Sequence, residues 1–458
     1  MTDPRFETLV EQVRSGAIDR RTFLVRSFAL GISAAAAGSV LAGTVAAQDA
    51  TPAASPAVLG GLTPENLGVE GVEHITDTSK GTINLYSSWP LSGASEKSGG
   101  DSAAAVRMAV DIWGGEAVGY AINYEALDDG IAANNGAWDA AVEANNATQV
   151  VNDPDAVVYI ATDNSGAAET AIPIMNEAGM AMISPANTAV QLTKENEANP
   201  EGYPEVLYPT GERNYMRVVP ADDLQGGASA NWAYNTLGAQ STYILHDNQT
   251  YGRGLANVVQ STFEGLGGEV LGFEAFAPDA PEYQALATKI ANAAPALVYI
   301  SAIVNLNAAK LLQDLRELMS VDDVAIMGPD GLINQAFIDG AGDAAEGMYL
   351  TFGGLPANEL EGVGAEWYNS IREILGHEPD AYAAYSFEAA VVSLQGIDRA
   401  GVNDRAAILD AMFTTEGFRG LIGTWSFTET GDTTADTISL NVVEGAVITF
   451  QEVIGLPS

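Results

Sequence analysis

The feature that most constrains the fold of this chain is a double series of alternating strand and helix patterns. In the first series, an apolar strand pattern at 156–161 stands between helix patterns at 138–151 and 167–176. The remaining elements of the series are strands at 82–88, 120–127 and 180–184 and a helix at 101–113. Strands separated by single helices form parallel βαβ units with right-handed crossovers. The first series therefore predicts a mainly parallel α/β sheet.

The second series begins after a linking strand at 215–219. Its strands are predicted at 241–246, 269–273, 296–300 and 324–327, and its helices at 224–237, 252–266, 283–293 and 305–319. Two more helices near Trp367 and Phe387 and a β-rich tail from Trp425 follow. Two successive series favour two similar lobes over one large sheet. Since ligands of open α/β sheets bind at the carboxyl ends of the strands, two facing sheets would enclose a cleft.

The first 47 residues have the order of a targeting segment. The basic run Asp-Arg-Arg-Thr-Phe-Leu at 19–24 precedes an apolar stretch at 28–42 and small residues before Gln48. The paired arginines resemble a twin-arginine (Tat) export signal, from which Asp19 and Val25 depart. The alternative is a membrane anchor, but the stretch is shorter than the roughly 20 residues of a spanning helix. We interpret 1–47 as a signal peptide and the Pro/Ala/Thr-rich segment 48–78 as a flexible linker.

Length and composition narrow the function classes. A chain of 458 residues exceeds one ordinary core and indicates two domains beside the targeting segment. Its 60 acidic and 19 basic residues give a formal charge of −41, which repels nucleic acid and anionic lipid and suits a salty or acidic medium. The chain has no cysteine. Disulfides, thiolate zinc sites, cysteine nucleophiles and a lipid-modified cysteine anchor are therefore excluded.

The sequence offers little for catalysis. Its three histidines, His74, His246 and His377, are far apart, and it contains no HExxH, GxSxG, Walker A or GxGxxG motif. The acidic pair Asp128-Asp129 follows a strand and precedes a Gly/Asn-rich loop, so we interpret it as a solvated turn. We expect no enzyme activity, no catalytic residue, no metal and no cofactor.

Five short runs give the chain a family resemblance. They are Pro90-Leu91-Ser92-Gly93, Met182-Ile183-Ser184-Pro185-Ala186-Asn187-Thr188, His246-Asp247-Asn248-Gln249-Thr250-Tyr251-Gly252, Met327-Gly328-Pro329-Asp330-Gly331 and Gly342-Asp343-Ala344-Ala345-Glu346-Gly347. In order and spacing, from about residue 80 to about 432, they resemble the branched-chain amino-acid-binding (Leu/Ile/Val-type) family of periplasmic receptors. The resemblance implies the type I periplasmic binding protein fold, with two Rossmann-like α/β lobes, mainly parallel sheets and a three-crossover hinge. We expect lobe 1 at 79–221 plus 353–424 and lobe 2 at 222–352 plus 425–458.

The resemblance also implies a function. It predicts an exported substrate-binding protein of an ABC transporter, which takes a branched-chain-type amino acid or related amide into the interlobe cleft, closes by hinge movement and delivers to a membrane permease. We expect a monomer at the periplasmic or extracellular face of the cytoplasmic membrane, without nucleic acid as a partner. The alternative is a ligand-sensing receptor for urea, an amide or an aromatic acid that signals to a partner protein.

Three first-lobe positions match ligand-binding residues of the family. Ser165 matches the serine that meets the ligand carboxylate at a helix start, where free N–H groups favour an anion. Ala186 and Thr188 match positions that offer a carbonyl, a hydroxyl and an N–H group, and an ammonium group needs such acceptors. The alternatives are that Ser165 is only an N-cap and that 184–188 is only a proline-punctuated turn.

In the second lobe, Asp330 matches the glutamate that pairs with the ligand ammonium, and Tyr251 matches a tyrosine of the cleft wall. The alternatives are a turn residue in Pro-Asp-Gly for Asp330 and a core tyrosine for Tyr251. His246 is expected to be structural or to act through other residues. The sequence departs from the family at Ile303 and Ser98, where aromatic residues are usual. Amides, urea-like solutes, other amino acids and aromatic acids therefore remain open as ligands.

Overall fold

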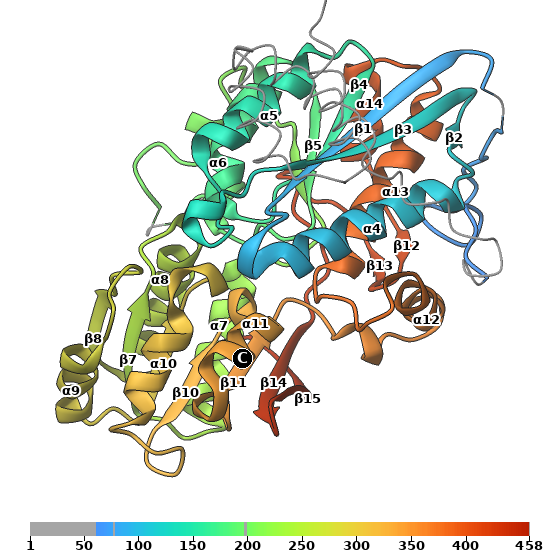
Figure 1. The fold of residues 1–458 in the computed structure, drawn as a ribbon. Helices are drawn as coiled ribbons and strands as arrows, with labels where there is room; N and C mark the ends of the chain where they lie inside the picture. Colours follow the sequence, from blue (N-terminus) through green and yellow to red (C-terminus); the bar gives the residue numbers. More distant parts are fainter. Residues whose placement is uncertain (1–60, 77, 197–198, 458) are drawn as a thin grey trace, which may run out of the picture. The chain divides into compact units, whose positions relative to one another are not determined.

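The computed structural model describes residues 61–76, 78–196 and 199–457. The predicted signal peptide at 1–47 and residues 48–60 and 77 of the predicted linker at 48–78 lie outside the described residues. Two larger sheets dominate the described part of the chain, each with helices on both faces (Figure 1). We call each sheet with its helices the first and the second lobe. The chain passes between the lobes at 218–221, 353–362 and 426–437, which are the three crossovers that the resemblance predicts.

The first sheet has the strand order β2-β3-β1-β4-β5-β6. The strands are β1 (Gly81–Trp89), β2 (Glu116–Ala117), β3 (Tyr120–Asp128), β4 (Ala156–Ala161), β5 (Ala181–Ser184) and β6 (Tyr215–Arg217). All neighbours pair in parallel except β2 and β3. The central strand β4 is buried along its whole length, because a parallel strand covered on both faces reads as a continuous apolar run.

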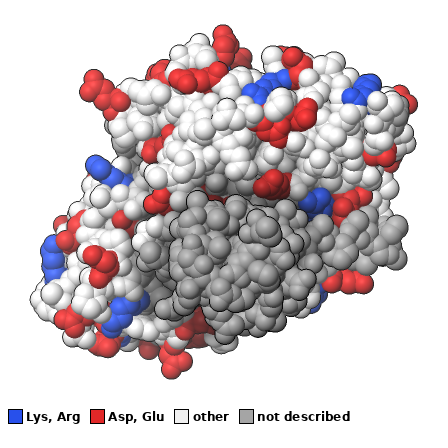
Figure 2. All heavy atoms as spheres, turned by 45° about the horizontal axis from the view of Figure 1, so that its top comes forward, with Lys and Arg blue, Asp and Glu red and all other residues white. Residues whose placement is uncertain are grey.

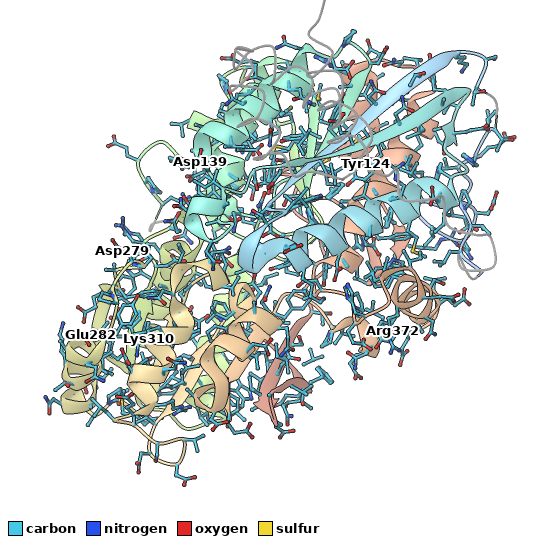
Figure 3. All side chains as sticks on the ribbon, viewed as in Figure 1. Tyr124, Asp139, Asp279, Glu282, Lys310 and Arg372 are labelled. Atoms are coloured by element: carbon cyan, nitrogen blue, oxygen red, sulfur yellow. The ribbon has the colours of Figure 1, made fainter. Side chains whose placement is uncertain are left out.

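Helices cover both faces of the first sheet (Figure 1). On one face, α5 (Ala140–Asn152) and α6 (Ser165–Glu177) pack against Tyr159 and Ala161 of β4. On the other face, α4 (Glu96–Ile112) and α13 (Ala383–Ala400) pack against Val158 and Ile160. The start of α5 is fixed by the Asp139 carboxylate, labelled in Figure 3, which accepts hydrogen bonds from two N–H groups of the first turn. These helices orient the carboxyl ends of the strands toward the second lobe.

The second sheet has the order β15-β14-β11-β10-β9-β7-β8. Its strands are β7 (Ser241–His246), β8 (Glu269–Ala275), β9 (Leu297–Ser301), β10 (Ala325–Gly328), β11 (Tyr349–Phe352), β14 (Ile438–Glu444) and β15 (Val447–Ile454). The last two are antiparallel additions at one edge of a parallel sheet. One face carries α7 (Asp222–Asn235) and α8 (Thr250–Gly265). The other carries α9 (Gln284–Ala293), α10 (Ala308–Arg316) and α11 (Gln335–Ala341).

The remaining elements extend the first lobe. They are α12 (Val363–Leu375), α14 (Arg405–Phe413) and the small antiparallel pair β12 (Phe418–Gly420) and β13 (Gly423–Trp425). Trp367 of α12, Phe418 and Trp425 join the same core as α4 and α13. The sequence patterns did not predict α14. None of the helices in the described ranges combines the length and the apolarity that crossing a membrane requires.

One expectation from the sequence is wrong. Asp128 is exposed, as the solvated-turn interpretation of the acidic pair requires, but Asp129 is fully buried. Neither carboxylate oxygen of Asp129 has a hydrogen-bond partner among the described residues. Burial and the nearby Glu143 raise its pKa well above the ordinary range. The Asp129 backbone explains the burial, because it bonds to Trp89 at the end of β1 and to Asp139 at the start of α5.

Candidate functional site

A cavity of about 50 Å³ lies between the two lobes at the carboxyl ends of strands from both sheets. Among its lining residues, the first lobe contributes Ser98, Asp163, Ser165, Ala186, Asp380 and Tyr382, and the second contributes Tyr251, Ile303, Asp330 and Ile333. As the lobes stand, a cavity of this volume has room for a few water molecules. A solute with more than a few heavy atoms therefore requires the lobes to move apart.

The first-lobe wall is a turn fixed by its own hydrogen bonds. After β5, the Ser184 hydroxyl accepts hydrogen bonds from the N–H groups of Ala186 (3.1 Å) and Asn187 (2.9 Å). The Ser184 hydroxyl donates to the Thr162 carbonyl at 2.8 Å, across to the loop after β4. The Asn187 amide donates to the Asp163 carbonyl at 3.0 Å. These bonds hold Ala186 beside the loop 162–165. The turn therefore positions residues of the cavity wall as well as reversing the chain.

A buried arginine supports this turn from behind. The fully buried Arg217 guanidinium donates to the carbonyls of Asn187 (3.0 Å) and Ala189 (2.8 Å). Its charge is balanced by Asp432, at 2.7 Å from Nε. Asp432 lies in the third crossover between the lobes, so this ion pair ties the first-lobe wall to the hinge. The sequence patterns did not single out either residue.

Ser165 is the first residue of α6, and Asn164 occupies the N-cap position without a side-chain cap bond. The alternative that Ser165 is only an N-cap is therefore wrong. Its hydroxyl accepts a hydrogen bond from the Ala189 N–H at 3.3 Å. Within the described part of the chain, the N–H groups of Ser165 and Gly166 have no hydrogen-bond acceptor. A helix start with free N–H groups beside a cavity favours an anionic ligand group.

The second-lobe wall is built from side chains. Asp330 follows β10, is 5% exposed and lines the cavity. One of its oxygens accepts hydrogen bonds from the Tyr251 hydroxyl (2.6 Å) and from the Gln225 amide (2.7 Å). The Tyr251 hydroxyl accepts a bond from the Gly331 N–H at 3.1 Å. Tyr251 is therefore a residue of the cavity wall as well as of the core, and it holds Asp330 in place.

Several hydrogen bonds join the two walls around the cavity. The hydroxyl of Tyr382, just before α13 of the first lobe, donates to the second oxygen of Asp330. At the rim, the Ser95 hydroxyl donates to the Asn305 side chain at 2.9 Å. On another side, the Thr250 hydroxyl donates to Glu169 of α6 at 2.8 Å. These contacts hold the lobes closed over the cavity.

Acidic groups dominate the electrostatics of the cavity. Burial raises the pKa of Asp330, although hydrogen bonds from Tyr251, Tyr382 and Gln225 oppose the shift. Burial, together with the charges of Asp380 and Asp330, raises the pKa of Asp163 to about 7. Burial also raises the pKa of Asp380, against the effect of the nearby Lys97. The surface is acidic too, and acidic side chains outnumber basic ones on the face shown in Figure 2.

Four of the five predicted site residues line the cavity, namely Ser165, Ala186, Tyr251 and Asp330. Thr188 does not line it, and its carbonyl accepts the Asp222 N–H at 2.8 Å. The two positions of departure, Ile303 and Ser98, do line the cavity. His246 does not, and its ring packs against Phe273.

The polar residues of the wall that sequence reasoning missed include Asp163, Asp380 and Tyr382, and the others are Ser95, Asn164, Asn305 and Asn334. Asp163 stands two positions before Ser165 on the loop after β4, and that position could have indicated it. Asp380 and Tyr382 belong to the segment that returns to the first lobe after the second sheet, where no strand end marks them. The described residues contain no cluster of three or more histidine or carboxylate groups that could hold a metal ion.

Comparisons with known proteins identify the family of this chain. A family model described as periplasmic binding protein matches residues 83–445. The Leu/Ile/Val-binding protein homolog 1 of Brucella abortus is 28% identical over 269 residues, which are 59% of this chain and 67% of that protein. These matches confirm the resemblance that the five sequence runs indicate.

Solved structures have the same fold. A leucine-binding protein from Thermotoga maritima matches with a TM-score of 0.71 and 25% identity, over 82% of this chain and 99% of that one. A solute-binding protein of an ABC transporter from R. palustris, solved with benzoate, matches with a TM-score of 0.68 and 19% identity, over 82% and 98%. The predicted fold class of two mainly parallel α/β lobes is confirmed.

Proposed function

Because the chain belongs to the periplasmic binding protein family, we propose that it is the extracytoplasmic solute receptor of an ABC importer and binds an amino acid or a related amide. The family consists of binding proteins, so the prediction that the chain is not an enzyme is confirmed. The predicted export signal supports a location outside the cytoplasmic membrane, where the receptor would act as a monomer and deliver its ligand to a membrane permease.

The observation that carries the proposal is the cavity between the lobes. It combines the free N–H groups at the start of α6 with the Asp330 carboxylate on the opposite wall. An amino acid has one anionic and one cationic end, and these two groups are complementary to them. The names of the Brucella abortus and Thermotoga maritima proteins, which refer to leucine, isoleucine or valine, support the same ligand class.

The two walls suggest an order of events. The first-lobe wall is fixed by backbone and buried side chains and can accept the solute while the lobes are apart. The second lobe then brings Asp330 and Tyr251 to the ligand, and the bond from Tyr382 to Asp330 joins the lobes. A ligand shifts this equilibrium only by its difference in affinity for the open and closed forms. The closed form would offer the permease a surface made by both lobes.

A receptor for aromatic acids that signals to a partner protein is the second candidate. The R. palustris structure with benzoate supports it, because that protein has the same fold. The acidic lining of the cavity opposes it, since benzoate is an anion.

A thermal-shift screen of the refolded full chain tests these functions. Refolding removes a bound ligand, and a solute that binds only the folded state raises the melting temperature. We expect a rise with solutes that carry an ammonium or amide N–H group, tested as amino acids, amides, urea and small polyamines. A rise with aromatic acids alone would favour the second candidate. No rise with any of these solutes would contradict the receptor proposal.

A further inference from the structure

Three carboxylates face the cavity without a countercharge. Asp163, Asp330 and Asp380 line it, and no lysine, arginine or histidine is among the described residues of the lining. None of the three forms an ion pair within the described part of the chain. Lys97, whose charge lowers the pKa of Asp380, is bonded to Asp101 at 2.8 Å instead. No cationic side chain of the described lining balances these carboxylates.

Asp163 has the least support of the three. The Asp330 carboxylate accepts bonds from two tyrosine hydroxyls and an amide, and the Asp380 carboxylate accepts one from the Ser98 hydroxyl at 3.0 Å. The Asp163 carboxylate accepts no hydrogen bond from any described residue, and only its backbone carbonyl is bonded. An acceptor-only group that lines a cavity without a donor is suited to a donor supplied by the ligand.

A neutral amino acid fits this lining poorly. Its single ammonium group can pair with one carboxylate and leaves the other two unbalanced in a site sheltered from water. Removing charges from water without pairing them is costly. The carboxylate of the ligand, bound at Ser165, would also stand near Asp163, only two residues away. A second positive group on the ligand reduces both difficulties.

Resting on the proposed receptor function, we propose that the ligand is a small solute with two positively charged nitrogen groups, one paired with Asp330 and the other with Asp163 and Asp380. The apolar side chains of Ile303, Val304 and Ile333 line the same cavity and suit a short methylene spacer between the charges. A diamine and a diamino acid share this chemistry. They differ in the carboxylate that only the diamino acid would place at the start of α6.

Isothermal titration calorimetry of the refolded full chain tests the proposal with four probes: 1,4-diaminobutane, ornithine, leucine and benzoate. We expect the better of the two dications to bind about tenfold or more tightly than leucine, because it pairs one more buried carboxylate. Preference for ornithine would assign a diamino acid, and preference for diaminobutane a diamine. Leucine or benzoate binding as tightly as both dications would overturn the inference and leave the receptor proposal standing. Failure of all four probes to bind would contradict both.

Two variants sharpen this test, with a matched control. Asp163→Asn and Asp380→Asn each remove one charge from the lining. We expect each to weaken binding of the preferred dication about tenfold and to change leucine binding much less. Asp279→Asn makes the same change at an exposed residue of the second lobe, labelled in Figure 3, and should leave both affinities unchanged. If both lining variants bind the dication as the control does, the inference is wrong. Circular dichroism establishes that each variant is folded, and two lining variants keep the test open if one is not.

Discussion

The two walls of the cavity are built in different ways. The first-lobe wall is a backbone turn, held by Ser184 and Asn187 and supported from behind by the buried ion pair of Arg217 and Asp432. The second-lobe wall is a set of side chains around Asp330. One wall offers N–H and carbonyl groups of fixed position, and the other offers a carboxylate whose hydrogen bonds can be exchanged for a ligand. Damage to the turn should therefore cost stability, and damage to the carboxylates that face the cavity should cost affinity.

The largest effect is expected from Arg217→Met. It leaves the Asp432 carboxylate without its partner and removes the donors to the carbonyls of Asn187 and Ala189. Breaking a buried ion pair from one side typically costs about 3–5 kcal/mol, and we expect the free energy of unfolding to fall by that amount. Urea denaturation measures the change.

The control is Arg372→Met, at the residue labelled in Figure 3. The Arg372 guanidinium pairs with Glu378 at 2.7 Å, and both side chains are largely exposed. Exposed pairs contribute about 0–1 kcal/mol, so this variant should be almost as stable as the parent. Equal losses in the two variants would contradict the supporting role of Arg217.

Asp330→Asn changes the second-lobe wall. The variant keeps an oxygen that can accept from Tyr251 or Gln225, and it removes a carboxylate whose pKa is raised by burial, so stability should hold. Affinity for the preferred ligand should fall by about 2 kcal/mol or more, since one partner of a buried charged pair is lost. Calorimetric titration and urea denaturation of the same sample separate the two effects. A loss of stability with unchanged affinity would remove Asp330 from the binding site.

The third prediction concerns the buried carboxyl group of Glu143, on α5 behind the first-lobe wall. Burial raises the pKa of Glu143 to about 7 from an ordinary value of 4.5, while hydrogen bonds from Ser88 and Tyr159 oppose the shift. The buried Asp129 faces it, and Asp163 lies near Asp129. Since the folded-state pKa is raised, protonated Glu143 contributes stability fully below about pH 4.5, and this is lost as pH rises through about 7.

We therefore expect the ligand-free protein to lose on the order of 2 kcal/mol of unfolding free energy between pH 5 and pH 8. Urea denaturation at each pH measures the slope. Glu143→Gln should make the slope shallower without abolishing it, because the pKa of Asp163 is also raised to about 7, whereas Glu125→Gln, at an exposed position of β3, should leave the slope unchanged. A stability that rises over this range would contradict the raised pKa. The direction agrees with the acidic medium that the composition of the chain suits.

The sequence predicts the fold well where a pattern is local. The apolar run of β4 and the alternation of strands and helices show the order of both sheets, and the Ser-Pro-Ala-Asn turn after β5 locates most of the first wall. Asp330 and Tyr251 were placed by the resemblance to the Leu/Ile/Val-type family, through the motifs that follow β10 and β7. Asp330 stands two residues after β10, and Tyr251 lies in the first turn of the helix that follows β7, at the end of the sheet where α/β folds place their ligands.

The sequence fails where a residue depends on a distant partner. The sequence around Asp129 is typical of a surface turn, because it does not indicate that α5 and the end of β1 cover this residue. Asp380 and Tyr382 reach the cavity only because the chain returns from the second lobe to the first before α13. Arg217 has its counterion more than two hundred residues away. Such long-range pairings have no periodicity to reveal them.

The smallest effect is expected from Tyr382→Phe, which removes the one hydrogen bond between the Asp330 carboxylate and the first lobe and keeps the ring contact with Phe352. A single hydrogen bond contributes about 1 kcal/mol, or slightly more when its acceptor is charged. Because the bond exists only with the lobes together, its loss should speed ligand release about fivefold and leave unfolding almost unchanged. Stopped-flow dissociation measures the rate.

The control is Tyr251→Phe. It removes a hydroxyl bond to the same carboxylate within one lobe, so it should speed release less than Tyr382→Phe does. If the two variants release ligand at the same rate, the bond between the lobes has no part in closure.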